Sequence, residues 1–86
     1  MHKIFLHRNA SKFYQKANKS LKGKISVAID AISRNPHLDV HVKKLKGELR
    51  HMYRFRFGDL RILYEIDDTT KTVWIITIEW RGAVYK

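Results

Sequence analysis

Arginines within residues 52–64 are spaced so that they can act together on a phosphate group. In an extended strand, successive side chains point to opposite faces, so Arg54 and Arg56 share one face while aromatic residues occupy the other. The pair Gly58-Asp59 is typical of a tight turn and predicts a β-hairpin that brings Arg61 back beside them. Converging guanidiniums repel one another unless an anion lies between them, and their fork-shaped donors suit phosphate. The stretch therefore predicts an anion-binding face.

Two residues near the end of the sequence extend this candidate site. The β-prone run Thr72–Trp80 predicts a strand, and continued alternation puts Arg81 on the same face as the other arginines. The same alternation puts Trp74 and Trp80 together on the opposite face, where we expect them to be core residues. Tyr85 has little packing to do at this position, so its ring or hydroxyl is available to a nucleotide.

The histidines do not have the spacing of a metal site. The five histidines are His2, His7, His37, His41 and His51. No two of them fit a metal pair on one helix face and there is no cysteine, so we expect no metal site. His51 is the candidate for proton transfer, although alternation puts it on the Tyr53 side unless the strand begins after it. The four glycines stand singly, so no phosphate loop and no cofactor is expected.

The charge balance is strongly basic. Among 86 residues, 18 are Lys or Arg and 8 are Asp or Glu, which gives a formal net charge of +10. Such a charge favours an anionic partner: a nucleic acid, an acidic protein or an anionic membrane. The candidate RNA-binding residues form two clusters, and they are Lys12, Lys16, Lys19, Lys43, Lys44, Lys46 and Arg50. No apolar run is long enough for a membrane helix or a signal peptide, so we expect a cytoplasmic protein.

The N-terminal half of the sequence predicts one strand and two helices. Residues 3–8 alternate weakly and predict a short strand. Asn9 or Ser11 can cap a first helix that ends near residue 19, and Ser20 can cap a second. The second helix ends at Asn35-Pro36, because the residue before proline is pushed out of the helical region. A short connection makes the two helices an antiparallel hairpin.

The C-terminal half predicts mostly strands. Residues 37–48 have no clear period and carry much charge, so we expect a loop there, and residues 67–71 are a turn cluster between the hairpin and the last strand. The predicted fold is α+β in a single domain, 1–86. It contains an N-terminal strand, a helix hairpin and a three-stranded antiparallel meander, which form one curved sheet with the helices on one face.

Three segments of the sequence resemble the RelE/ParE toxin superfamily of type II toxin–antitoxin systems. They are the run Lys44-Leu45-Lys46-Gly47, the run from Tyr53 through Gly58-Asp59-Leu60-Arg61 to Tyr64, and the ending Arg81-Gly82-Ala83-Val84-Tyr85. The RelE-like branch consists of ribosome-dependent mRNA endonucleases, and the resemblance favours this branch. Such enzymes cut by attack of a ribose 2′-OH on the adjacent phosphate. The resemblance also implies a cognate antitoxin as a partner, besides the ribosome and mRNA, and no cofactor.

The resemblance assigns roles to five residues. Arg54 and Arg56 stand where the RelE-like branch has two active-site basic residues, which implies RNA positioning. Arg61 matches its phosphate-contacting arginine, Arg81 matches its late-strand arginine, and Tyr85 matches its C-terminal tyrosine. Some relatives have lysine at the first two positions, and lysine shifts its pKa more readily than arginine, so the proton acceptor stays open. The lysine-rich helices are implied to contact ribosomal RNA.

Two other functions remain open at this point. The ParE-like branch of the superfamily poisons DNA gyrase, and the stretches Leu45-Lys46-Gly47 and Gly58-Asp59-Leu60-Arg61 are similar to this branch too. The third reading is a toxin-like module that binds RNA or the ribosome without cutting, because arginines alone provide no evident general base.

Overall fold

The computed structural model describes residues 1–37 and 39–81 as a mixed sheet with two helices. Its elements are β1 (Lys3–Leu6), α1 (Arg8–Lys16), α2 (Lys19–Arg34), β2 (Val42–Lys44), a 3₁₀ turn (Gly47–Leu49), β3 (Met52–Phe57), β4 (Leu60–Asp67) and β5 (Thr72–Trp80). The strands are ordered β1-β5-β4-β3-β2; β1 is parallel to β5, and the other neighbours are antiparallel. The predicted α+β fold is confirmed. Within the described residues, no helix has the length and apolar character required to span a membrane.

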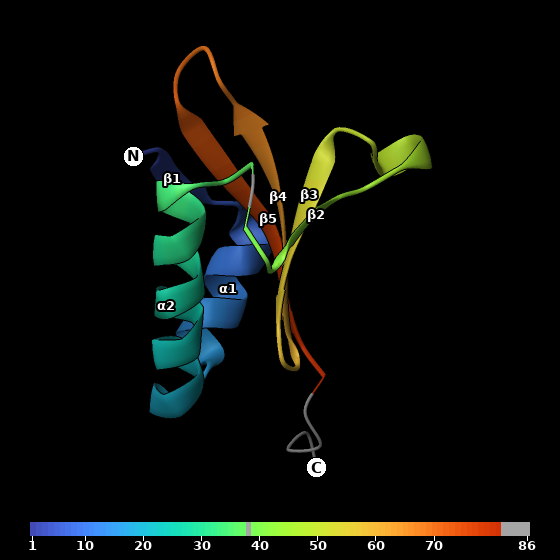
Figure 1. The fold of residues 1–86 in the computed structure, drawn as a ribbon. Coiled ribbons are helices and arrows are strands. Elements are labelled where there is room, and N and C mark those ends of the chain that lie inside the picture. Colours follow the sequence, from blue (N-terminus) through green and yellow to red (C-terminus); the bar gives the residue numbers. More distant parts are fainter. Residues whose placement is uncertain (38, 82–86) are drawn as a thin grey trace.

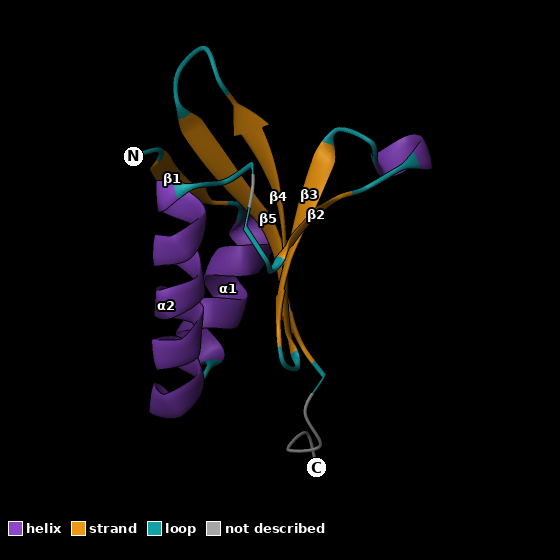
Figure 2. Ribbon diagram, in the orientation of Figure 1, coloured by secondary structure: helices purple, strands orange, loops and turns teal. Residues whose placement is uncertain are grey.

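Both helices lie on the same side of the sheet, and the opposite side is left open (Figures 1 and 2). The core therefore forms between the helices and one sheet face. Its buried side chains include Ile25, Ala28 and Ile32 from α2, Ile62 and Tyr64 from β4, and Ile75 from β5. These residues recur every three or four positions in the helix and every second position in β4, as burial of one face requires.

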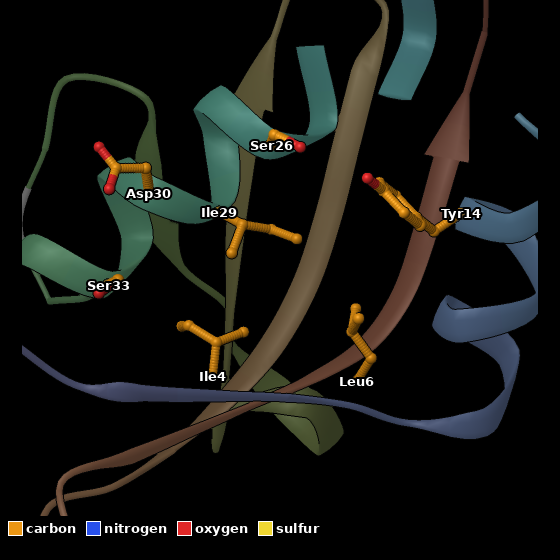
Figure 3. Close-up of a pocket in the computed structure, with 7 residues that line it drawn as sticks. All are labelled: Ile4, Leu6, Tyr14, Ser26, Ile29, Asp30 and Ser33. Atoms are coloured by element: carbon orange, nitrogen blue, oxygen red, sulfur yellow. The ribbon is translucent and has the colours of Figure 1, made fainter. Parts of the chain in front are cut away.

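The helix side also contains an apolar hollow of about 390 Å³. Ile4 and Leu6 of β1 point into it, toward Tyr14 of α1 and Ile29 of α2 (Figure 3). The sheet separates this hollow from the arginines of β3 and β4.

A short strand occupies part of the predicted loop 37–48. Strand β2 pairs with β3 over three residues, with Val42 opposite Phe55 and Lys44 opposite Tyr53. A three-residue strand has no measurable period, so the sequence pattern could not reveal it. It forms because β3 otherwise presents unpaired backbone groups along its edge. The meander is therefore extended by a fifth strand that the sequence analysis missed.

The alternation predicted for β5 is broken by a β-bulge. Leu63 pairs with Thr77, but the next residue of β4, Tyr64, pairs with Ile75, so that Ile76 is an extra residue in β5. Such an insertion reverses the side-chain phase beyond it. Trp80 therefore packs against the core, whereas Trp74 lies on the open side of the sheet. The prediction that both tryptophans share a core face is wrong for Trp74.

Trp74 is 43% exposed and forms an aromatic pair with β1. Its ring stacks on Phe5, which is itself 47% exposed, with centroids 5.1 Å apart. The pairing follows the register, because Phe5 and Trp74 are direct partners across the parallel β1–β5 ladder.

The helix starts differ from those predicted. Helix α1 begins directly after β1, with His7 rather than Asn9 or Ser11 at its N-cap position, and the His7 side chain caps nothing. Helix α2 begins before Ser20, because Asn18 adopts the extended conformation of a cap and its side chain accepts a hydrogen bond from Leu21 N at 2.8 Å. Asn18 and Ser20 are both residue types that cap helices, and the sequence alone does not show which of the two does so here.

Replacing Asn18 with alanine is expected to lower the free energy of unfolding by about 1 kcal/mol, because α2 loses its capping hydrogen bond. Urea denaturation followed by circular dichroism measures this change. His7→Ala is the matched control, since it alters an N-cap residue whose side chain makes no capping bond, and it should change stability by less than about 0.5 kcal/mol. Equal losses in the two variants would contradict the assignment of the cap.

Candidate nucleic-acid interface

The open side of the sheet carries a cluster of cations from β2, β3 and β4. We define the arginine face as Lys43, Arg54, Arg56 and Arg61. Arg56 and Arg61 are direct partners across the β3–β4 ladder, and Lys43 is the partner of Arg54 across β2–β3. Direct partners in a sheet point to the same face, about 5 Å apart. The predicted convergence of the three arginines on one face is therefore confirmed by the register of the hairpin.

The hairpin forms as the sequence predicts. Gly58 has a φ of +60°, a conformation in which glycine has no Cβ penalty, and the strands pair from Phe57-Leu60 back to Met52-Glu65. Phe55 and Ile62, which flank the arginines along the chain, are buried in the core on the helix side. Core burial thus fixes which way the arginines point, because alternation leaves them only the open face.

An open hollow of about 530 Å³ lies at the β2 edge of the arginine face. Lys43, Arg54 and Arg56 line it, together with His41 and Gly58. Three cations around one hollow raise the local positive potential and favour an anion of the size of a nucleotide phosphate. Arg61 is not part of this lining; it lies next to Arg56 on the inner strand.

Arg61 is partly engaged by a carboxylate. One of its terminal nitrogens lies 3.5 Å from Glu79, its direct partner on β5, and the two side chains are 30% and 48% exposed. An ion pair of this exposure is weak, so an anionic ligand can replace the carboxylate. In addition, the Nε atoms of Arg54 and Arg61 are buried and have no hydrogen-bond partner among the described residues. These guanidiniums therefore keep donors that the described protein does not satisfy.

Arg81 follows β5 and is exposed. Its backbone N–H donates to the carbonyl of Asp59 at 2.9 Å, which holds it beside the turn of the hairpin, close to the start of β4. That its side chain lies on the arginine face stays a prediction, because β5 ends at Trp80. Tyr85, the fifth residue of the predicted site, lies outside the described residues.

The comparisons with known proteins agree with this geometry. A family model described as the ParE toxin of the type II toxin–antitoxin system parDE matches residues 4–85. The chain belongs to this toxin family. The resemblance to the RelE/ParE superfamily is thereby confirmed, and the protein is a toxin of the type II toxin–antitoxin class. At the level of sequence alone, no curated protein matches the toxin.

Solved structures of the superfamily share the fold of the toxin. The RelBE2 toxin–antitoxin complex from Mycobacterium tuberculosis matches with a TM-score of 0.79 and 28% identity, over 93% of the toxin and 98% of that chain. The RelE–RelB complex from Pyrococcus horikoshii matches with 0.76 and 24%, over 96% and 98%. The isolated Escherichia coli RelE toxin matches with 0.78 and 18%, over 99% and 92%. Matches of such low identity show the fold and leave the target of the toxin open.

The remaining predicted RNA-binding residues are distributed over several surfaces. Lys12 and Lys16 lie on α1 and Lys19 begins α2, on the side of the sheet opposite the arginine face (Figure 1). Lys44 lies on the Tyr53 side of the sheet, with its Nζ 5.9 Å from the centre of the Tyr53 ring. Only Lys43 of the predicted lysines is part of the arginine face.

Lys46 and Arg50 flank the 3₁₀ turn between β2 and β3. Arg50 Nη1 donates to the carbonyl of Gly47 at 3.5 Å, a long bond that leaves the exposed guanidinium largely available to solvent. A ligand on the arginine face would contact Lys43 directly. It would reach Lys46 and Arg50 only if it extended beyond the end of β2.

His51 lies at the far end of the hairpin from the arginine pair. Strand β3 begins after it, so alternation does not put it on the Tyr53 side, and its Nε2 lies 3.2 Å from Glu65 Oε2. Glu65 lies four positions after Arg61 along β4, which corresponds to about 13 Å. His51 is thus remote from the Arg56–Arg61 pair, although it is only three positions before Arg54 in the sequence.

His41 is the titratable residue at the hollow that the sequence analysis did not select. It lines the hollow together with Arg54 and Arg56, and its ring lies 5.3 Å from the rings of both Phe55 and Phe57. An imidazole can both accept and donate a proton, which a guanidinium cannot do, but this ring lies against phenylalanines that point to the helix side, where it also borders α2 residues Val27 and Ala31. No local pattern points to it, because residues 37–48 have no clear period and only the pairing of β2 brings residue 41 to β3.

Replacing Glu79 with glutamine is expected to strengthen RNA binding by up to about fivefold, because it frees Arg61 from an exposed ion pair. Fluorescence anisotropy with a labelled single-stranded RNA measures the dissociation constant. Asp30→Asn is the matched control: it removes the same charge from the exposed Arg34–Asp30 pair on α2, on the other side of the sheet. If both variants gain affinity equally, the effect is one of net charge and Arg61 has no special role.

Proposed function

We propose that the toxin is an mRNA endonuclease that acts on translating ribosomes and so inhibits translation. The observation that carries this proposal is the hollow lined by Lys43, Arg54 and Arg56, with Arg61 beside it on the same face. A surface of fixed cations with open donors matches a phosphodiester, whose negative charge grows during cleavage. The structural likeness to RelE toxins is consistent with this assignment.

The proposed reaction is an internal transfer at one phosphate. The 2′-oxygen of a ribose attacks the adjacent phosphorus, the bond to the 5′-oxygen of the next nucleotide breaks, and a cyclic phosphate and a 5′-OH remain. The 2′-OH loses a proton and the leaving oxygen gains one. We assign Arg61 and Arg81 to stabilising the charge on phosphorus, Arg54 and Arg56 to positioning the RNA, and Tyr85 to orienting the nucleotide.

Proton transfer needs a different kind of group from arginine. His51 lies at the far end of the hairpin, and the His41 ring packs against Phe55 and Phe57, which point to the helix side of the sheet, away from the arginine face. The ribosome can compensate for a weak general base if it holds the message in a geometry ready for attack. The proposal therefore assigns proton transfer to neither of these two histidines.

A second candidate function is the poisoning of DNA gyrase, and a specific observation favours it: the family model that matches the chain is that of ParE toxins. A third is ribosome or RNA binding without cleavage. The arginine face is compatible with all three, because DNA, RNA and acidic protein surfaces are all anionic.

One induction experiment separates these candidates. RNA 5′ ends are mapped across the transcriptome shortly after induction of the toxin, and DNA breaks are measured in the same cells. New 5′ ends within translated messages, with intact DNA, are expected. DNA damage with intact messages would instead identify a gyrase poison, and stable ribosome association without new ends would identify an inactive binding module.

We also propose a cognate antitoxin as the partner of the toxin. Two of the structural relatives were solved as toxin–antitoxin complexes. An acidic segment that folds on binding could cover the basic surface and oppose its charge. Co-expression with the product of an adjacent gene should restore growth if that product is the antitoxin.

A further inference from the structure

Three residues from distant parts of the chain form a polar cluster on the far side of the molecule from the hairpin turn. His2 precedes β1, His37 follows α2, and Asp68 lies in the turn between β4 and β5. Asp68 Oδ1 lies 2.9 Å from His37 Nε2 and 3.5 Å from His2 Nε2, and one ligand atom from each residue lies within 4.8 Å of the other two. The sequence spacing gave no hint of this cluster, because 31 positions separate Asp68 from His37.

The backbone around His2 is held in place from two sides. His2 N donates to the carbonyl of Ser33 at 2.9 Å, and Ser33 Oγ donates back to the carbonyl of His2 at 3.1 Å. The next residue, Lys3, donates to the carbonyl of Lys71 in the β4–β5 turn. His2 is therefore tied both to the end of α2 and to the turn that contains Asp68.

The turn that presents Asp68 is ordered by its neighbour. The Asp67 carboxylate accepts hydrogen bonds from the backbone N–H groups of Thr69 and Thr70, at 3.0 and 3.4 Å, and from the Thr69 hydroxyl. The hydrogen bonds, of which that from the Thr69 side chain is the largest contribution, lower the pKa of Asp67. With this carboxylate used by the turn, the Asp68 carboxylate is left to face the histidines.

The ring of His37 is oriented by a tyrosine pair. Its Nδ1 lies 3.3 Å from the Tyr53 hydroxyl, and the Tyr53 ring stacks on Tyr64 with centroids 5.8 Å apart. The buried Tyr64 hydroxyl donates to the carbonyl of Pro36 at 2.7 Å, which fixes the residue before His37. Burial raises the pKa of Tyr64, so this donor stays protonated. His37 Nε2 is thus directed toward Asp68 by contacts on its opposite nitrogen.

His2 Nε2 lacks a comparable partner. It is buried and makes no hydrogen bond with the described residues, although it lies near Asp68, and the His2 side chain is only 14% exposed. At 3.5 Å the Asp68 carboxylate is a long contact for this nitrogen, and a metal ion between the two would satisfy both groups.

We propose that His2, His37 and Asp68, brought together at one end of the sheet, bind a Zn²⁺ ion with water as the fourth ligand. Two imidazole nitrogens and one carboxylate oxygen are a common zinc ligand set. Ligand atoms about 2.1 Å from a tetrahedral ion lie about 3.4 Å apart, close to the 2.9 and 3.5 Å between Asp68 and the histidines. Tyr53 supplies the outer contact that metal-bound histidines usually make through their second nitrogen.

The bound ion would join the N-terminal segment, the end of α2 and the β4–β5 turn. This inference is independent of the proposed endonuclease activity, because the cluster and the arginine face use different residues. The pairing of His37 with Asp68 alone would be an ordinary surface contact, and the third group, His2, is what makes the cluster a candidate metal site. Mg²⁺ and Ca²⁺ prefer oxygen ligands and are not expected to bind.

The test uses the full chain without an affinity tag, purified with chelator and dialysed. Isothermal titration with Zn²⁺ should give one site per chain, thermal melting should shift upward with Zn²⁺ but not with Mg²⁺, and Co²⁺ should give the absorption bands of a tetrahedral site. His2→Gln, His37→Gln and Asp68→Asn should each weaken Zn²⁺ binding by more than about tenfold. His51→Gln is the control, because His51 and Glu65 form a pair without a third ligand.

A further variant tests the site without the risk that a ligand substitution simply unfolds the protein. Tyr53→Phe keeps the ring that stacks on Tyr64 and removes only the hydroxyl near His37, and it should weaken Zn²⁺ binding by about 10- to 100-fold. The proposal is overturned if the unaltered protein binds no Zn²⁺, or if Tyr53→Phe and the ligand variants bind it as tightly as His51→Gln does.

Discussion

The Arg61→Ala variant is expected to cleave RNA about 10²- to 10³-fold more slowly than the unaltered toxin on translating ribosomes, because a fixed cation is removed from the growing phosphate charge. Arg61 combines three properties: it is the direct partner of Arg56, its ion pair with Glu79 is exposed, and its Nε has no partner among the described residues. Arg61→Lys keeps the charge but loses the planar fork, so it should recover part of the rate.

Single-turnover cleavage of a message on purified ribosomes measures this effect, with growth arrest after induction as a second readout. Arg34→Ala is the matched control: Arg34 also pairs with a carboxylate, that of Asp30, but it lies on α2 and is 68% exposed. It should cleave within about twofold of the unaltered toxin if only the arginine face contacts the message at the site of cleavage. Unchanged cleavage by Arg61→Ala, with a well-folded protein, would remove Arg61 from the proposed site.

The Ile62→Ala variant is expected to lose about 2 to 5 kcal/mol of its free energy of unfolding. Ile62 is fully buried on the central strand β4, opposite Phe55 on β3 and Ile78 on β5, so truncation leaves a cavity in the middle of the core. Because small domains are stable by only about 5 to 15 kcal/mol, this loss is a large share of the total. Activity would fall as well, since the same strand carries Arg61.

Urea denaturation measures the change, and an unchanged dependence on urea concentration would show that only stability has altered. Val27→Ala is the control, because it also shortens an aliphatic side chain, but one that is 67% exposed on α2. Its stability should change by less than about 0.5 kcal/mol. A small effect of Ile62→Ala would mean that the sheet closes the cavity more readily than such cores usually do.

The hairpin shows why part of the site could be predicted. Alternation along β3 and β4 and the turn at Gly58-Asp59 are local properties, and together they determine that Arg54, Arg56 and Arg61 share one face. Because these residues are close together in the sequence, the arginine face could be predicted without knowledge of the tertiary structure. The order of helices and strands could be predicted for the same reason, since each element has its own period.

Other features depend on contacts between distant segments and therefore had no local signal. The bulge at Ile76, which moves Trp74 to the open side, results from how β5 must pair with β4. The strand β2, and with it the place of His41 and Lys43 beside Arg54, exists only because β3 offers an open edge. The meeting of His2, His37 and Asp68 requires the whole sheet to close first.

The sequence by itself determined the fold class, the superfamily and the face that the hairpin arginines occupy, because side-chain alternation and turn chemistry act over a few neighbouring residues. Only the tertiary structure decided which other groups lie near these arginines. Arg61 pairs with Glu79, His51 pairs with Glu65 at the far end of the hairpin, and His41 borders the hollow beside β2. Pairing register and edge completion are set by packing across the sheet, and no short segment of the chain contains that information.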